Sequence, residues 1–209
     1  CKRVVAAVGV PVLPSVVIRH KDELAKASFQ LPAFVKPNTE GSGKGVRMSS
    51  RVTTTQELID QVVWVIETYQ QPALVEPFLP GREFTVGVLG DNPPQALPVM
   101  EITPGLKNHA QPHFIYSYET KAGNLETLCC PADIPSDLAD LLCEIALRAH
   151  LALGCRDVSR VDLRLDEAGN PFFLETNPLP GLAENSLLPM QAAAAGLDFD
   201  DLIGVIVEA

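Results

Sequence analysis

Two segments near the carboxyl end, SRVDLRLD (159–166) and PFFLETN (171–177), constrain the fold more than any other part of the sequence. Apolar and polar residues alternate along both, and the turn-forming EAGN lies between them, so together they predict a β-hairpin. A loop centred on Ala168 and Gly169 places residue 166 opposite 171, and counting outward from that pair places Asp162 opposite Glu175.

Strand alternation then separates the hairpin into two faces. We expect the polar face to carry Arg160, Asp162, Arg164, Glu175 and Asn177. We expect the core face to carry Val161, Leu163, Leu165, Phe172 and Leu174.

The opposed carboxylates of Asp162 and Glu175 need a partner, because Cβ atoms of facing residues lie roughly 4.5 to 5.5 Å apart and like charges at that distance repel. One interpretation is a divalent cation, Mg²⁺ or Mn²⁺, held by Asp162, Glu175 and Asn177 through hard oxygen ligands. The other is a solvated face neutralised by Arg160 and Arg164, and the charge pattern alone favours it.

The rest of the chain predicts an α+β fold, since strands and helices interleave without a regular βαβ order. Thr54 and Glu57 have the spacing of a capping box ahead of an amphipathic helix, Ser136 is predicted to cap a second helix, and Gly154 to end it. Further strands are predicted at 16–19, 33–36, 46–50, 73–79, 83–90 and 96–102, further helices at 22–26, 186–196 and after Asp198, and a long functional loop at 103–125.

A glycine-rich loop, NTEGSGKG (38–45), follows the predicted strand that ends at Lys36. It matches neither the P-loop pattern nor the dinucleotide-binding pattern, and it connects two predicted strands like a flap. Its glycines would let backbone N–H groups approach phosphate oxygens, but an ordinary surface turn and a solvated Lys36 explain the same residues equally well.

Composition excludes several classes of protein. The 209 residues carry a formal charge of −10, which disfavours a nucleic-acid partner. No apolar run is long enough to cross a bilayer, and the amino-terminal segment lacks the features of a signal peptide, so we expect a soluble, cytoplasmic protein without a membrane partner. The chain begins without Met on what looks like the end of a helix, and we expect an upstream part to be missing.

Taken in order, the motifs resemble a known family. They are FVKPNTEGSGKGV (34–46), LVEPFLPGREFTV (74–86), YETK (118–121), SRVDL (159–163) and FLETNPLPG (173–181). The sequence is similar over nearly its whole length to the ATP-grasp domain of D-alanine–D-alanine ligases. That resemblance implies an ATP-grasp fold, in which antiparallel sheets and packed helices enclose a nucleotide.

The resemblance also implies roles for individual residues. Those implied to bind ATP are Lys36, Glu40, Gly41, Ser42, Gly43, Lys44, Glu76, Leu79, Glu83 and Lys121. Those implied to be catalytic are Arg160, Lys121 and Ser42, and those implied to hold Mg²⁺ are Asp162, Glu175 and Asn177. Arg160, Gly181, Ser186 and Leu187 are implied to contact the amino-acid substrates.

The function implied is a carboxylate–amine ligase that joins two molecules of D-alanine through an acyl-phosphate for peptidoglycan precursor synthesis. Two alternatives stay open: a ligase with another amino-acid, hydroxy-acid or peptide acceptor, favoured by Ala122 and the Glu184–Asn185 pair, and a nucleotide-binding domain without catalysis. The expected organisation is an upstream remnant (1–15), a small subdomain with the glycine-rich loop (16–80) and a large subdomain with the metal and acceptor sites (81–209). The family's amino-terminal domain is the expected partner, and a homodimer is left open.

Overall fold

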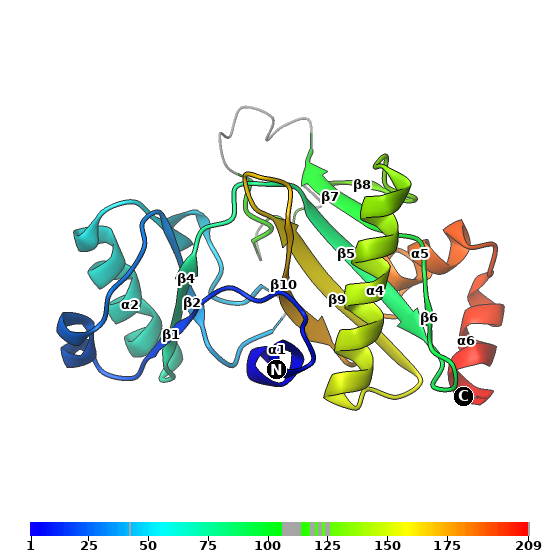
Figure 1. The fold of residues 1–209 in the computed structure, drawn as a ribbon, viewed down its shortest axis with the longest axis horizontal. Helices are drawn as coiled ribbons and strands as arrows, with labels where there is room; N and C mark the ends of the chain where they lie inside the picture. Colours follow the sequence, from blue (N-terminus) through cyan, green and yellow to red (C-terminus); the bar gives the residue numbers. More distant parts are fainter. Residues whose placement is uncertain (42, 106–113, 118–119, 121–122, 124–125, 209) are drawn as a thin grey trace. The chain divides into compact units, whose positions relative to one another are not determined.

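The computed structural model describes residues 1–208 except 42, 106–113, 118–119, 121–122 and 124–125 (Figure 1). The chain forms two compact units. Unit 1 consists of Cys1–Val12, Gly81–Thr103 and Thr127–Ala209, and unit 2 of Leu13–Pro80 and Pro104–Glu126. One boundary between the units falls between Pro80 and Gly81, where the sequence also suggests a division, whereas the sequence did not suggest that residues 104–126 belong with unit 2. The predicted Ser42 and Lys121, and also Ala122, lie outside the described residues.

The elements of unit 2 form one sheet covered by one long helix. Its strands are β1 (Val16–Ile18), β2 (Ala33–Pro37), β3 (Arg51–Val52) and β4 (Ala73–Pro77), in the order β1-β4-β2-β3. Its helices are η1 (Lys21–Lys26), η2 (Met48–Ser50) and α2 (Thr55–Tyr69). Leu58, Val62 and Val65 of α2 pack on Ala33, Val35, Ala73 and Val75, so the opposite face of β2 and β4 is left for other contacts.

Unit 1 is built on a larger sheet, with the strand order β10-β9-β5-β7-β8 and β6 paired to β5. The strands are β5 (Glu83–Leu89), β6 (Gln95–Ala96), β7 (Met100–Pro104), β8 (Glu126–Cys129), β9 (Val158–Leu165) and β10 (Pro171–Asn177). The helices are α1 (Lys2–Ala7), α4 (Ser136–Leu153), α5 (Leu187–Ala194) and α6 (Phe199–Glu208).

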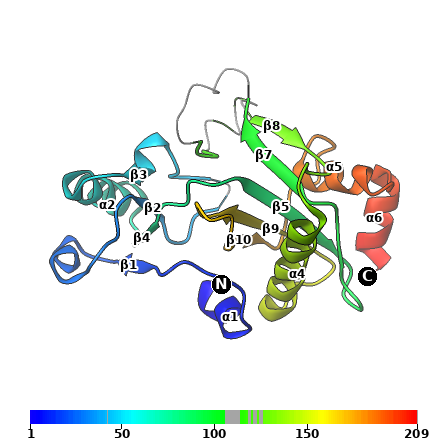
Figure 2. The ribbon, with the colours of Figure 1, turned by 45° about the horizontal axis from the view of Figure 1, so that its top comes forward.

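The helices of unit 1 cover the two faces of this sheet differently (Figure 2). α1 and α4 pack on the face that carries Phe84, Val86, Val161 and Leu163. α5 and α6 pack on the other face, but only at the end that carries Leu89 and Val158. The rest of that second face carries the polar residues of β5, β9 and β10. Antiparallel sheets with packed helices confirm the α+β class.

The hairpin of β9 and β10 confirms the predicted pairing of Asp162 with Glu175, but by a different route. At the turn, Leu165 rather than Asp166 faces Pro171, because Gly169 at φ +86° allows a three-residue loop closed by Asp166 N–H donating to Asn170 O at 2.9 Å. A β-bulge between Phe173 and Glu175 then restores the predicted register at the carboxylates.

The bulge also decides which aromatic residue enters the core. The prediction that Phe172 and Leu174 lie on the core face is wrong: Phe173 is fully buried beside Leu163, and Phe172 and Leu174 are half-buried. Because the extra residue, Leu174, falls after Phe173, Glu175 still points to the polar face.

The predicted strand at 46–50 is also wrong. Met48–Ser50 forms the 3₁₀ helix η2, and only Arg51–Val52 pairs with β2. Ser50 explains the difference, since its Oγ accepts from Arg47 N–H at 3.1 Å and donates to Gly45 O at 3.5 Å. Such local side-chain bonds compete with the ladder of a strand.

Two element boundaries differ from prediction, whereas the capping box of α2 and the glycine that ends α4 agree with it. The predicted strand at 96–102 is split into β6 and β7 around Pro98, which has no N–H for a ladder, and the residue that caps α4 is Pro135 instead of Ser136. Thr54 and Glu57 form the predicted capping box, and Gly154 ends α4 at φ +65°. Among the described residues, no helix is long and apolar enough to cross a membrane.

Candidate functional site

The polar face of unit 1 is organised around Asp162, which is 8% exposed. Its Oδ1 accepts hydrogen bonds from Thr85 Oγ at 2.6 Å and from Arg160 Nε at 3.1 Å. Its Oδ2 accepts from Arg160 Nη2 at 3.2 Å and from Asn177 Nδ2 at 3.0 Å. Three strands therefore converge on one carboxylate: β5 through Thr85, β9 through Arg160 and β10 through Asn177.

The pairing of β9 with β10 brings the predicted metal ligands together. Glu175 faces Asp162, and Asn177 faces Arg160 two residues further along. Arg160 lies two residues before Asp162 on β9, and the two side chains form an ion pair. The Coulomb attraction of this pair reduces the repulsion between the two opposed carboxylates.

A second ion pair lies on the same face. Glu83 of β5 faces Arg164 of β9, and Arg164 Nη1 donates to Glu83 Oε2 at 2.9 Å, with both side chains about nine-tenths buried. Arg164 Nε also donates to the backbone O of Gly81 at 3.2 Å. The guanidinium thus fixes both the Glu83 side chain and the start of β5, a contact that the sequence did not predict.

In unit 2, two of the predicted nucleotide-binding residues, Lys36 and Glu76, lie on the sheet face opposite α2. Ala33, Val35, Ala73 and Val75 pack against α2, so strand alternation turns Phe34, Lys36, Leu74 and Glu76 the other way. Lys36 faces Leu74, and Glu76 faces Phe34. Lys36 is half-buried, and Glu76 and Leu79 are buried.

The glycine-rich loop connects β2 with η2 and is tied at both ends. Gln71 accepts from Thr39 N–H at 2.8 Å and donates to Glu40 Oε1 at 2.8 Å, and Ser50 Oγ donates to Gly45 O. Gly43 and Gly45 have φ values of +74° and +75°, which a residue with a side chain rarely adopts. Lys44 N–H donates to Gly41 O at 3.1 Å.

The predicted acceptor residues meet at the start of α5. A Cβ atom built on Gly181 would lie 3.0 Å from Ser186 Oγ, so these two residues are neighbours in space. Ser186 is the N-cap of α5, and Leu187 is its first residue.

Sequence reasoning missed Gln191, which is fully buried one turn further along α5. Its Nε2 donates at 3.0 Å to the backbone O of both Thr85 and Pro98. Gln191 thus fixes α5 to the strand that carries Thr85. A glutamine in an alanine-rich helix gives no signal of such a contact, because its partners lie 93 and 106 residues away in the sequence.

The donor set of Asp162, Glu175 and Asn177 fits a hard divalent cation, since it offers two carboxylates and one amide oxygen. In the structure Asn177 presents its Nδ2 to Asp162, so the amide would have to turn to offer Oδ1 to a cation. The described residues include no group of three or more His, Cys, Asp and Glu side chains placed to hold a metal. The set therefore depends on the amide of Asn177 and on oxygens supplied by water or substrate.

Comparison with solved structures defines the class of protein. The fold is similar to that of the VanG D-Ala:D-Ser ligase from Enterococcus faecalis, with a TM-score of 0.81 and 26% identity over 99% of this chain and 59% of that one. It is also similar to the D-alanine–D-alanine ligase from Bacillus anthracis complexed with ATP, with a TM-score of 0.74 and 24% identity over 99% of this chain and 62% of that one. The chain has the ATP-grasp fold.

Sequence comparison then identifies the family. The model of the family described as "D-ala D-ala ligase C-terminus" matches residues 4–208, and the chain belongs to this family. The D-alanine–D-alanine ligase of Roseobacter denitrificans is 40% identical over 205 residues, which cover 97% of this chain and 59% of that protein. The chain thus spans about three-fifths of the length of this curated relative.

Proposed function

We propose that the protein containing this chain is an ATP-dependent ligase that joins two D-alanine molecules for peptidoglycan precursor synthesis. Membership of the family supports this proposal, as does the printed name of the relative from Roseobacter denitrificans. The observation that carries it is the polar face of β5, β9 and β10. This face gathers Glu83, Arg160, Asp162, Glu175 and Asn177 on one side of a sheet whose other side is core.

The proposed chemistry has two steps. The carboxylate of the first D-alanine attacks the γ-phosphorus of ATP, giving an acyl-phosphate and ADP. The amine of the second D-alanine then attacks the acyl carbon, loses a proton, and phosphate leaves as the peptide bond forms. Every charged intermediate is anionic, so catalysis depends on positioning and on cationic groups rather than on a protein nucleophile.

We assign the residues of this chain to these steps as follows. Lys36 binds ATP phosphate, and Lys121 binds the γ-phosphate. Glu76 and Leu79 contact the adenine. Glu83 accepts from the ribose hydroxyls, and its ion pair with Arg164 holds the carboxylate for this task. Arg160 donates to the oxyanion that forms at the acyl carbon.

The loop and the start of α5 complete the assignment. Glu40, Gly41, Ser42, Gly43 and Lys44 cover the phosphates, where loop closure keeps water from the acyl-phosphate. Gly181, Ser186 and Leu187 contact the second amino acid. Asp162, Glu175 and Asn177 would hold Mg²⁺, which when bound offsets the charge of the phosphates.

A second candidate is the same chemistry with another acceptor. The solved structure with a TM-score of 0.81 is named as a D-Ala:D-Ser ligase, which favours keeping D-serine as an alternative second substrate. In this assignment Gly181 and Ser186 contact the second amino acid, so their surroundings would decide between D-alanine and D-serine.

The experiment that separates these candidates measures phosphate release and dipeptide formation with Mg·ATP across a panel of D- and L-amino acids. We expect release to depend on D-alanine and D-alanyl-D-alanine to form. Formation of D-alanyl-D-serine at a higher kcat/KM would favour the second candidate. Phosphate release that no amino acid stimulates would contradict both.

The proposed metal set has its own test in Glu175→Gln, which removes one charge and keeps the shape of the side chain. We expect turnover at saturating Mg²⁺ to fall on the order of 100-fold, since the lost charge acts on the reacting phosphates. Glu167→Gln, in the exposed turn of the same hairpin, is the matched control and should leave turnover unchanged. Equal turnover in both variants would remove Glu175 from the site.

A further inference from the structure

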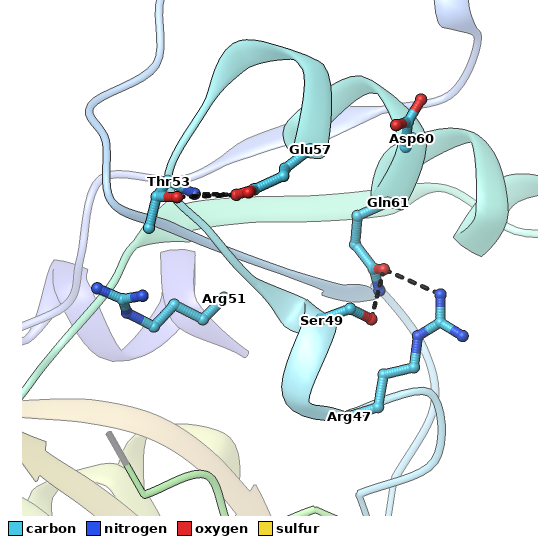
Figure 3. Close-up of a pocket in the computed structure, with 7 residues that line it drawn as sticks. All are labelled: Arg47, Ser49, Arg51, Thr53, Glu57, Asp60 and Gln61. Atoms are coloured by element: carbon cyan, nitrogen blue, oxygen red, sulfur yellow. Dashed lines mark hydrogen bonds between the residues drawn. The ribbon is translucent and has the colours of Figure 1, made fainter. Parts of the chain in front are cut away.

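Unit 2 contains a cavity of about 430 Å³. The residues that line this cavity have no assigned role in the proposed ligase reaction. Its lining comes from η2, β3, the segment before α2 and the first two turns of α2. The lining residues are Arg47, Ser49, Arg51, Thr53, Glu57, Asp60 and Gln61 (Figure 3). Arg47 and Gln61 lie together on one side of it, and Arg51 and Thr53 lie on the other.

Hydrogen-bond donors are in excess around this cavity. Three buried nitrogen atoms of its lining have no partner in the described part of the chain: Arg47 Nε, Arg51 Nε and Gln61 Nε2. All three are donors. No buried side-chain oxygen atom of the lining residues lacks a hydrogen-bond partner. A buried donor without an acceptor costs about 1 to 3 kcal/mol. The lining side chains cover these three donors, so a ligand recovers this loss when those side chains turn to present them to its acceptor oxygens.

Gln61 is the strongest sign that the cavity is a site, because it is a polar side chain with only 3% of its surface exposed. Its Oε1 accepts from Arg47 Nη2 and from Ser49 Oγ, each at 3.1 Å. These two bonds fix the amide with its oxygen toward the donors and leave Nε2 without a partner. Turning the amide over would break the bond from Arg47.

Each of the two guanidinium groups lies over an aromatic ring. Arg47 Cζ lies 3.3 Å from the centroid of the Trp64 ring, and Arg51 Cζ lies 5.1 Å from that of Phe78. Within the described residues, neither guanidinium forms an ion pair. A planar guanidinium stacked on an aromatic ring still presents its edge to carboxylate or phosphate oxygens.

The two acidic side chains of the lining accept hydrogen bonds from α2 and from the segment before it. Glu57 Oε2 accepts from Thr53 N–H at 2.7 Å, from Thr53 Oγ at 2.9 Å and from Thr54 N–H at 3.3 Å. These bonds, with a smaller effect of Arg51, lower the pKa of Glu57 below its usual value. Asp60 Oδ1 accepts from Gln56 Nε2 at 2.9 Å. On their side of the cavity a ligand hydroxyl is favoured over a second anionic group.

We propose that this cavity binds a small hydroxylated organic anion, whose phosphate or carboxylate group lies beside Ser49, between Arg47 and Gln61 on one side and Arg51 on the other. The volume exceeds that of one water, about 30 Å³, more than tenfold and leaves room for a short polyol chain beside the anionic group. The site is separate from the proposed ligase chemistry, because none of its residues is assigned to ATP, metal or substrate.

The test follows the side-chain Nε–H signals of Arg47 and Arg51 by NMR during titration of the protein. The probes are glycerol 3-phosphate, glycerate and inorganic phosphate, with glycerol as the neutral control. We expect saturable shifts of both signals with the anions and none with glycerol. Glycerol 3-phosphate and glycerate separate a phosphate ligand from a carboxylate ligand, and inorganic phosphate shows what the polyol chain adds.

Two variants locate the binding. Ser49→Asp places a negative charge at an exposed position of the lining and should abolish the shifts without disturbing the core. Arg51→Gln should weaken binding about tenfold, and Arg19→Gln, an exposed arginine of the same unit outside the cavity, should leave it unchanged. The proposal fails if no anion gives saturable shifts up to about 10 mM, or if Ser49→Asp binds as well as the unmodified protein. Neither result depends on ligase activity.

Discussion

At the scale of single residues, buried polar side chains decide how the polar face of unit 1 is held. Asp162, Glu83 and Arg164 are each about nine-tenths buried, and each has charged or hydroxyl partners from a neighbouring strand. Burial of a charge is tolerable only when such partners replace water. Thr85 donates to Asp162, and nothing in the pattern of residues along the chain predicts this contact.

We expect Thr85→Val to lower the free energy of unfolding by about 1.5 to 3 kcal/mol, because the 2.6 Å bond to a buried carboxylate is lost while the shape of the side chain is kept. Thr85→Ser keeps the hydroxyl and should cost about 1 kcal/mol for the lost methyl group. Denaturant unfolding measures both, and Thr68→Val on the exposed side of α2 is the control. A Thr85→Val loss no larger than that of Thr85→Ser would contradict this role.

At the scale of elements, the glycine-rich loop shows that glycines a few residues apart have different roles. A Cβ atom on Gly45 would overlap Pro37 and lie 3.1 Å from Tyr69 Cε2, at a φ of +75°. A Cβ atom on Gly41 would meet nothing within 4 Å. Gly45 is therefore required by the packing of unit 2 itself, whatever the loop binds.

This difference predicts that Gly45→Ala lowers the free energy of unfolding by at least about 1 to 2 kcal/mol, the cost of a left-handed backbone at a residue with a side chain. Gly41→Ala should change it by less than about 0.5 kcal/mol. Thermal or denaturant unfolding of the two variants side by side is the measurement. Equal stability of the two would show that the loop yields around Gly45.

The hairpin of β9 and β10 is the element in which the sequence came nearest to the site. The polar residues around the turn correctly predicted that Asp162 faces Glu175. The pairing at the turn differs from the prediction by one residue. The bulge after Phe173 shifts the register back, so the pairing of the two acids is as predicted. Alternation along a strand cannot reveal a bulge, because the extra residue looks like any other half-buried side chain.

At the scale of the whole molecule, each unit has hydrophobic clusters of its own. Leu58 of α2 is buried in the core of unit 2, and Leu142 of α4 is buried in the core of unit 1. Two separate cores predict two units of stability, because local unfolding follows the packing of each core.

Leu58→Ala and Leu142→Ala are matched substitutions that test this prediction. Each should lower the free energy of unfolding of its own unit by about 2 to 5 kcal/mol. The measurement is native-state hydrogen exchange of the backbone amides. We expect Leu58→Ala to raise the exchange rates in α2, β2 and β4. We expect Leu142→Ala to raise them in α4, β5 and β9. Equal loss of protection throughout the chain in either variant would show a single cooperative unit.

The sequence by itself determined what depends on near neighbours: the capping box of α2, the glycine end of α4, the hairpin and its opposed acids. Periodicity and turn chemistry act over a few residues, so they can be read without the fold. The order of the family motifs then pointed to the ATP-grasp class, which the solved structures confirm.

Only the tertiary structure decided the contacts between distant segments. Gln191 reaches Thr85 from α5, Gln71 holds Thr39 and Glu40 of the loop, and Gln61 closes one side of the cavity with Arg47. Glutamine has no distinctive pattern, since its amide bonds to whatever the fold brings within reach. The physical reason is that such hydrogen bonds depend on which backbones meet in space, and the spacing of residues along the chain does not encode it.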